Sequence, residues 1–354
     1  MKWVRRLALV LGILLAGALL LEAAFRIRLY RRAGTFSSET EYVIDPATGL
    51  GVPDSSYETP SMRINARNFR GPDVLVPKPP GRIRLAFLGG STTFCAQSSR
   101  EETTWPCLVR SALAEHHPEA SFDYVNASFI GYRLEHLSKT LEHRVKPLAP
   151  DVVVVYEATN DLTNDTRELA IEAGIYDGHG DRDSWLARHS LAWYLIEKNL
   201  LYKLRKDEAL GSGKHLALDT ARIAPGFQRR LVALIREAQA VAPVVAVATF
   251  SQRLRRGQTP AEQQAACVTH VYYMPYLDVE GLLAGFDAYN AAIRAAAAET
   301  GAILVEGEDE IPGDEVHFRD SVHFYDPGCE RMAARVVRGL EASGAFRELV
   351  ERAR

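Results

Sequence analysis

Several patterns that mark common functional classes are missing from this 354-residue sequence. It has only four cysteines and contains neither Cys-x-x-Cys nor His-Glu-x-x-His. We therefore predict no metal site, and no other cofactor. A formal net charge of −3 lacks the basic excess of nucleic-acid-binding proteins, so we expect no nucleic-acid partner. The predicted strands end in neither Gly-x-Gly-x-x-Gly nor Gly-x-x-x-x-Gly-Lys, which argues against a nucleotide-binding domain.

The four cysteines leave the redox state open. In an exported protein, Cys95, Cys107, Cys267 and Cys329 allow three disulfide pairings. Cys95 with Cys107 is locally feasible, and free buried thiols fit the sequence at least as well.

One long hydrophobic run is present, at the amino terminus. It extends from Leu7 to Phe25, follows three basic residues and is interrupted by a charge only at Glu22, near its end. Its length reaches the lower limit for a membrane-spanning helix. A cleaved signal peptide is the alternative, with small residues at 16–18. We predict an uncleaved signal-anchor over residues 1–32, with the following domain extracytoplasmic, either periplasmic or at the cell surface, because a six-residue tail precedes the run.

Residues 33–80 are rich in Ser, Thr, Pro, Asp and Gly, which predicts a linker with local turns. Within it, residues 65–72 form a compact polar stretch that can dock on the main domain. From the residues alone, a surface turn is the expected structure.

The rest of the chain, residues 81–345, alternates apolar runs with helical patterns. Runs that are apolar throughout and alternate with helices predict a parallel sheet covered on both faces, which is a three-layer α/β/α fold with five strands. The expected strands are Ile83–Leu88, Phe122–Asn126, Val152–Tyr156, Val244–Phe250 and Ala302–Glu306. The expected helices are Trp105–His116, Leu134–Val145, Pro225–Ala240, Phe286–Thr300 and Pro327–Leu340.

Two longer segments, Thr163–Ala224 and Ser251–Gly285, are predicted to be insertions with their own helices. Their aromatic residues can belong to the core or line a cleft, and we expect core for each taken singly: Trp185, Trp193, Tyr194, Tyr272, Tyr273 and Tyr276. His179 with Asp181 and Asp183 is a weak candidate metal site, in a Gly-rich loop that is better explained as solvated.

Polar residues stand where the predicted strands end. Ser91 follows Gly89-Gly90 directly after the first strand, and the loops 126–132 and 156–161 follow the next two. The loop 320–324 precedes the last helix. Because loops at the carboxyl ends of parallel strands share one edge of the sheet, these four segments can converge.

The residue types in these loops suit acyl transfer. His323 can remove the proton of the Ser91 hydroxyl, and Asp320 can hold the imidazole and stabilise its cation. The backbone N–H groups of Ser91 and Gly131, with the side-chain amide of Asn160, can form an oxyanion hole.

The four segments resemble, in order, the four sequence blocks of the SGNH (GDSL-type) hydrolase superfamily, over about residues 82–342. Gly89-Gly90-Ser91 resembles the nucleophile block, Gly131 and Asn160 match the oxyanion positions, and Asp320-x-x-His323 matches the last block. The stretch 65–71 also resembles the lead-in of membrane-anchored bacterial members. Three positions depart from the pattern: Gly90 stands where an Asp usually precedes the nucleophile, as in a Gly-Gly-Ser subset, Ala158 replaces the commoner glycine, and Phe324 replaces a frequent proline.

Asp314 and His317 have the same spacing as Asp320 and His323. We favour Asp320 and His323, since they directly precede the last helix, where the family block belongs. Asp161, beside Asn160, is expected to be a turn or cap residue.

The resemblance implies a flavodoxin-like fold and a serine esterase that acts on small acyl groups, such as acetyl, of a surface glycan. One alternative is an O-acyltransferase that uses the same residues to pass the acyl group to a polysaccharide. A second is a non-catalytic binding module of an envelope assembly. The sequence leaves the oligomeric state open.

Overall fold

A five-stranded parallel sheet forms the centre of the computed structural model, which describes residues 2–33, 42–56, 58–59, 61–176, 184–210 and 215–353. The strand order is β6-β5-β7-β8-β9, and all four pairings are parallel. The predicted α/β fold with five parallel strands is therefore confirmed. The strands are β5 (Arg82–Gly89), β6 (Ser121–Asn126), β7 (Val152–Tyr156), β8 (Val244–Ala248) and β9 (Ile303–Val305).

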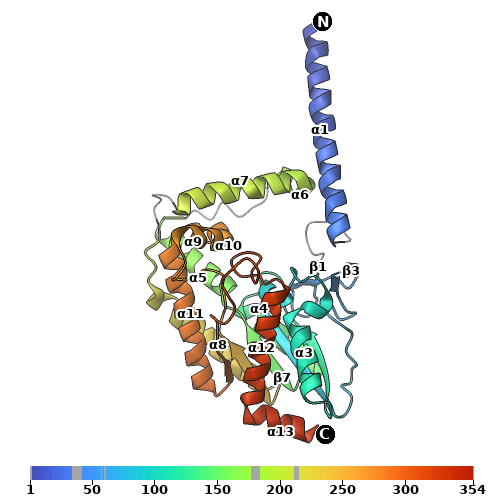
Figure 1. Ribbon diagram of the computed structural model, residues 1–354, viewed down its shortest axis with the longest axis vertical. Helices are drawn as coiled ribbons and strands as arrows, with labels where there is room; N and C mark the ends of the chain where they lie inside the picture. The colour runs from blue at the N-terminus through green and yellow to red at the C-terminus, as the bar shows by residue number, and fades with distance from the viewer. Residues whose placement is uncertain are drawn as a thin grey trace.

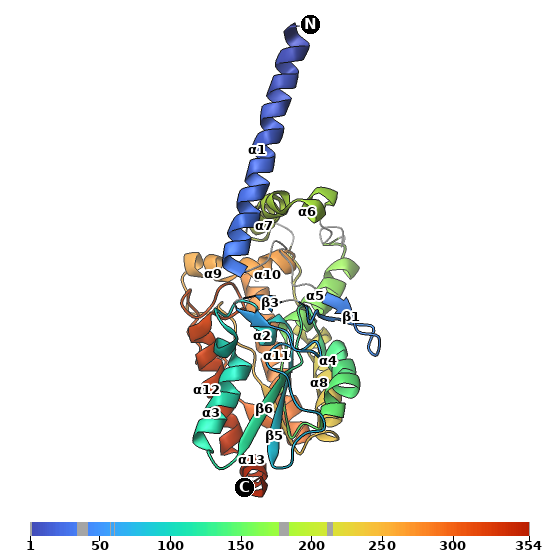
Figure 2. The same cartoon turned by 90° about the vertical axis from the view of Figure 1, so that its right-hand side faces the viewer.

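Helices cover both faces of this sheet (Figures 1 and 2). Helices α3 and α12 pack together on one face, and α4, α8 and α11 pack on the other. Helix α5 follows β7 directly, and α13 ends the chain. The bounds are α3 (Trp105–His116), α4 (Leu134–Thr140), α5 (Thr159–Glu172), α8 (Ala224–Gln239), α11 (Val279–Thr300), α12 (Asp326–Ala342) and α13 (Gly344–Arg352).

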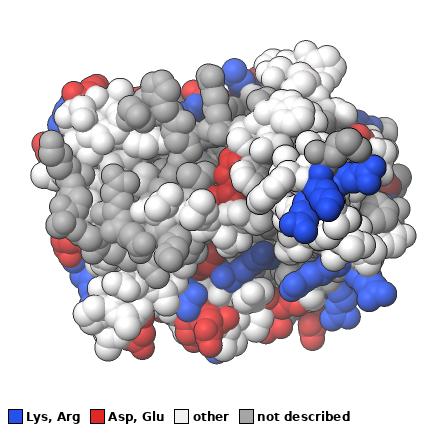
Figure 3. All heavy atoms as spheres, turned by 90° about the horizontal axis from the view of Figure 1, so that it is seen from above, with Lys and Arg blue, Asp and Glu red and all other residues white. Residues whose placement is uncertain are grey.

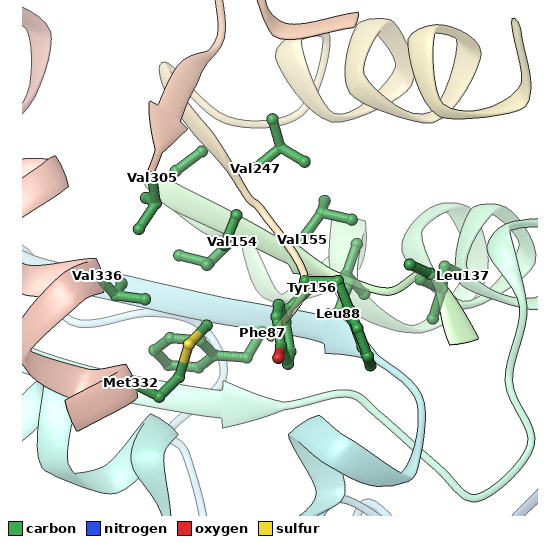
Figure 4. Close-up of a cluster of buried hydrophobic side chains, with 14 of the residues drawn as sticks. Phe87, Leu88, Leu137, Val154, Val155, Tyr156, Val247, Val305, Met332 and Val336 are labelled. Carbon is green, nitrogen blue, oxygen red and sulfur yellow. The ribbon is translucent and has the colours of Figure 1, made fainter. Parts of the chain in front are cut away.

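The central strands are apolar because both of their faces are buried. Every residue of β7 and β8 is buried, and burial of one such side chain contributes about 1.5–3 kcal/mol. Phe87 of β5 pairs in register with Val154 of β7. Figure 4 shows these strands contributing side chains to a cluster with Leu137 of α4 and with Met332 of α12.

Some elements begin or end away from their predicted limits. The strand predicted to reach Phe250 ends at Ala248, because the Asn290 side chain takes over the hydrogen bonds of the Phe250 backbone, at 2.7 and 3.0 Å. Helix α11 begins at Val279, seven residues before its predicted start, since the Asp278 side chain caps it by accepting the Gly281 N–H.

The segment before the sheet docks on the domain, so the expected surface turn at 65–72 is wrong. Arg70 is 1% exposed, and its guanidinium donates to Phe94 O at 2.6 Å, Ser61 O at 3.0 Å and Glu101 Oε2 at 3.0 Å. The bonds to Phe94 and Glu101 attach the segment to the residues that follow Ser91. Two short antiparallel pairs precede it, β1 (Tyr42–Ile44) with β2 (Gly51–Pro53) and β3 (Glu58–Thr59) with β4 (Met62–Arg63).

A long amino-terminal helix, α1 (Lys2–Ala33), projects from the body (Figure 1). Its stretch Lys2–Arg31 is long and apolar enough to cross a membrane and is not buried inside the protein, which makes it a candidate span. Helix α7 (Leu191–Leu210) runs across the body beside it, after the short α6 (Trp185–His189). The other short helices are α2 (Ser91–Phe94), α9 (Pro260–Ala266), α10 (Val268–Tyr273) and the irregular turns η1 (Glu101–Thr103), η2 (Leu141–Val145), η3 (Lys146–Leu148) and η5 (Thr220–Arg222).

Candidate active site

Ser91 stands at the junction of a strand and a helix. Strand β5 ends at Gly89, Gly90 caps the next helix, and Ser91 is the first residue of α2. Gly90 has an ordinary negative φ of −89°, so it does not serve here through unusual backbone angles. A Cβ at Gly90 would lie 2.4 Å from Asn160 Nδ2 and 2.5 Å from Glu157 Oε2. The glycine is needed because these two side chains approach the backbone closely.

The structure brings Ser91, His323 and Asp320 together. His323 Nε2 lies 2.8 Å from Ser91 Oγ, and His323 Nδ1 lies 2.8 Å from Asp320 Oδ2. With Asp320 accepting the Nδ1 proton, Nε2 is left to accept the proton of the serine hydroxyl.

The loop that carries this pair is held in place by its own backbone bonds. Asp320 Oδ1 accepts the N–H groups of Val322 and His323, both at 3.0 Å. Ser321, between them in sequence, is buried, and its hydroxyl accepts the N–H groups of Thr269 and His270. Helix α10, in the second insertion, therefore fixes the position of the loop.

Asp320 is stabilised in its charged form. Burial alone would raise its pKa, but the attraction of His323 and the hydrogen bonds of that ring and of two backbone N–H groups outweigh it, and the pKa lies well below the usual range. Nearby His270 is buried, and burial lowers its pKa to about 3, so this ring is neutral. Its Nε2 lies 3.0 Å from Gln252 Oε1.

Gly131 and Asn160, the two predicted oxyanion residues, line the same pocket as Ser91 and His323. Asn160 Nδ2 donates to Tyr132 O at 2.9 Å and makes a longer contact of 3.4 Å to Glu157 Oε2. Because the amide has two N–H groups, the weaker contact leaves one of them able to turn to a ligand. Gly131 adopts φ +75°, a conformation that favours glycine.

Glu157 was not singled out from the sequence, yet it lies directly behind the site. Its side chain is 2% exposed, and Oε1 accepts the Asn160 N–H at 2.8 Å. Burial, with the charge of Asp161, raises its pKa to about 8, against bonds from the Asn160, Gly90 and Ala158 N–H groups that lower it. A lone glutamate in a sequence normally suggests a surface residue, so no signal pointed to it.

Ala158 and Asp161 lie on either side of Asn160 in the sequence. Ala158 has φ −158°, so the positive backbone angle considered for this position does not occur. Asp161, expected as a local turn or cap residue, lies buried in the first turn of α5, and its Oδ2 accepts the N–H of Leu134, the first residue of α4, at 2.9 Å. Burial raises the pKa of Asp161 to about 6, partly offset by that bond and by Arg230.

The rival pair forms its own bond away from the serine. His317 Nδ1 lies 2.7 Å from Asp314 Oδ1, and Asp314 is about half exposed. The serine hydroxyl contacts His323 instead. His179, Asp181 and Asp183 lie outside the described residues. All four cysteines are free and buried, so the feasible Cys95–Cys107 disulfide is not formed.

A pocket of about 740 Å³ surrounds Ser91 and His323. Helix α7 contributes Tyr194 and Lys198 to its lining, and helix α10 contributes Thr269 and Tyr273. Of the aromatic residues predicted as core, Tyr276 is buried, whereas Tyr194 and Tyr273 line this cleft. The remaining lining side chains include Gln97, Ile130, Arg133, His136, Thr163, Asn164 and Arg167.

Comparison with known proteins places the chain among ester-cleaving enzymes. The model of the GDSL-like lipase/acylhydrolase family matches residues 87–331, and no curated protein matches the chain. One solved structure with a similar fold is the acetylxylan esterase Axe2 of Geobacillus stearothermophilus. Its sequence is 16% identical, the alignment covers 73% of this chain and 93% of that chain, and the TM-score is 0.44. A putative GDSL-like lipase of Parabacteroides merdae has 16% identity, covers 74% and 96%, and has a TM-score of 0.45. LAE5, an α/β hydrolase from a lake metagenome, has 13% identity, covers 73% and 94%, and has a TM-score of 0.44.

Proposed function

Because the chain belongs to the GDSL-like lipase/acylhydrolase family, we propose that it is a membrane-anchored serine esterase whose catalytic triad is Ser91, His323 and Asp320. The observation that carries this proposal is the unbroken hydrogen-bond chain from the serine hydroxyl to the half-buried Asp320 carboxylate, with two contacts of 2.8 Å. Such a chain both activates a serine and stabilises the imidazolium that forms. A binding module would not need it.

The reaction follows from this geometry. His323 Nε2 removes the proton of Ser91 as Oγ forms a bond to the ester carbonyl carbon, and the carbonyl oxygen becomes an oxyanion. The Ser91 and Gly131 N–H groups and the Asn160 amide donate to that oxyanion. The bond to the alcohol oxygen then breaks, and His323 returns its proton to the departing alcohol. A water molecule, deprotonated by the same histidine, releases the acid from the acyl-enzyme.

We propose that the natural substrate carries small acyl groups, acetyl above all, on a surface glycan. The pocket supports this choice because polar side chains such as Gln97, Asn164 and Thr269 line it, and they can bind hydroxyl groups of a sugar. An acyltransferase would use the same residues and differ only in the acceptor of the acyl group.

The anchor and its orientation belong to the same proposal. Helix α1 is a candidate span, and its Glu22 accepts the N–H groups of Leu191 and Ala192, at 3.0 and 2.8 Å, and the Ser190 hydroxyl at 2.8 Å. These bonds cap the first turn of α7 and attach α1 to the folded body, which favours a retained helix. As part of the same proposal, the catalytic domain is extracytoplasmic.

The test is turnover of p-nitrophenyl acetate and release of acetate from an acetylated glycan by the full chain in detergent. Ser91→Ala is expected to lower kcat/KM by about 10³-fold or more. Equal rates for the wild type and Ser91→Ala would refute the proposed nucleophile. Transfer of the acetyl group to an added oligosaccharide in preference to water would replace the esterase by the acyltransferase.

A further inference from the structure

The outer side of α6 and α7 carries apolar side chains that the rest of the described protein leaves uncovered. Trp185 and Trp193, predicted as core, are 65% and 42% exposed, so that expectation is wrong. The exposed apolar residues of α7 are three and four positions apart, which places them along one side of the helix. They are Trp193, Ile196, Leu200 and Leu204, and Leu186 of α6 is exposed with them.

This apolar side faces away from the active site. Tyr194 and Lys198, on the same helix, line the pocket around Ser91. At about 3.6 residues per turn, Ile196 and Leu200 lie on the far side of the helix from these two residues. Helix α7 therefore separates the pocket from an apolar stripe on the outside of the protein. A clustered apolar surface of this kind marks an interaction with another protein or with a membrane.

The position of α1 favours a membrane over another protein as the surface that covers this apolar stripe. Glu22 binds the amino-terminal turn of α7, so this turn lies at the level of residue 22. Figures 1 and 2 show that the preceding part of α1 extends beyond α7, on the side away from the catalytic body. The apolar residues 7–21 span about 22 Å as a helix, most of the roughly 30 Å hydrocarbon core of a bilayer, and the basic residues Lys2, Arg5 and Arg6 lie beyond them. If α1 crosses the membrane, α7 begins where the hydrocarbon ends.

The direction and surroundings of α7 agree with that position. Helix α7 runs across the direction of α1 (Figure 1), so it lies along the surface of a bilayer that α1 crosses. Tryptophan side chains are enriched at this interface, and interfacial helices bury one apolar face in it. Figure 3, the view from above, shows a group of Lys and Arg side chains on the right of this face.

We propose that α6 and α7 rest on the bilayer that holds α1, with the stripe of Trp193, Ile196 and Leu200 in the interface and the active-site pocket directly beneath the membrane surface. This inference rests on the proposed anchoring by α1 and not on the proposed esterase activity. Ester groups close to the membrane are then the ones that the pocket reaches.

The test uses the full chain in vesicles of phosphatidylcholine and phosphatidylglycerol, with and without brominated acyl chains. An environment-sensitive fluorophore is attached to one introduced cysteine at a time, Leu14→Cys on α1 or Ile196→Cys on α7; all four native cysteines are buried. Glu348→Cys on α13, at the opposite end of the molecule (Figure 1), is the matched control. Far-UV circular dichroism and the thermal unfolding midpoint report the fold of each labelled variant independently of any activity.

We expect loss of emission in brominated vesicles for the labels at positions 14 and 196, and none at 348. Quenching at 14 with an unquenched label at 196 would overturn the placement of α7 and leave the anchor in place. A label at 196 that shifts to shorter wavelength without quenching would mean that protein covers the stripe, which also overturns the proposal. No quenching at 14 would reject the anchor and the inference together.

Discussion

His323 Nε2 lies 2.8 Å from Ser91 Oγ, although 232 residues separate the two in the chain. The parallel sheet makes this contact possible, because the end of β5 and the loop before α12 lie at the same edge of the sheet. Asp320 completes the arrangement from three residues away, so its contact with His323 is local.

Asp320→Asn should lower kcat by about 10²–10⁴-fold with a smaller change in KM. The amide cannot stabilise the imidazolium, and it can hold the wrong tautomer of His323. Asp314→Asn is the matched control, since Asp314 contacts His317 in the same spacing but away from the serine. A large loss of kcat in Asp314→Asn with normal turnover in Asp320→Asn would assign the triad to the other pair.

Asn160→Ala should lower kcat by about 10²-fold, because one donor to the oxyanion is lost. The side chain also binds Tyr132 O, so the thermal unfolding midpoint is measured beside the kinetics. A variant that melts like the wild type and loses only substrate affinity would mean that Asn160 binds the ground state and not the oxyanion.

The stability of the protein should depend on the protonation of Glu157. Its pKa is raised from 4.5 to about 8, so between these two values the folded state holds a proton that the unfolded state has lost. The stability that this proton contributes is complete below about pH 4.5 and declines as the pH rises toward about 8. Glutamine at this position cannot titrate. The melting temperature of Glu157→Gln should therefore rise relative to that of the wild type as the pH increases through that range. A difference in melting temperature that stays constant from pH 5 to pH 9 would contradict the prediction.

Arg70→Met should destabilise the protein by about 3 kcal/mol, because it leaves buried carbonyl groups of Ser61 and Phe94 without their donor and Glu101 without its partner. The change is measured by urea unfolding of the full chain in detergent. Arg67→Met, at an exposed side chain three residues earlier, should change little. Equal effects of the two substitutions would show that the docking of residues 65–72 adds nothing to stability.

The sheet and the strand-end loops could be predicted because their signals are local. Four consecutive valines in β7 suit only a strand buried on both faces, and a serine after Gly89-Gly90 is visible in the sequence. Glu157 and Arg70 could not be predicted, since the burial of a charged side chain depends on partners that only the fold supplies. Trp185 and Trp193 were expected in the core because hydrophobicity does not distinguish a protein interior from a membrane surface.

The central claim is that Ser91 is an activated nucleophile, and reaction with a fluorophosphonate tests it most directly. The full chain is treated in detergent, and the adduct is located by peptide mass spectrometry in the wild type, His323→Ala and His317→Ala. We predict one adduct on Ser91, formed at the wild-type rate in His317→Ala and lost or strongly slowed in His323→Ala. A folded wild type without an adduct on Ser91, or an adduct that forms equally fast in His323→Ala, would contradict the account.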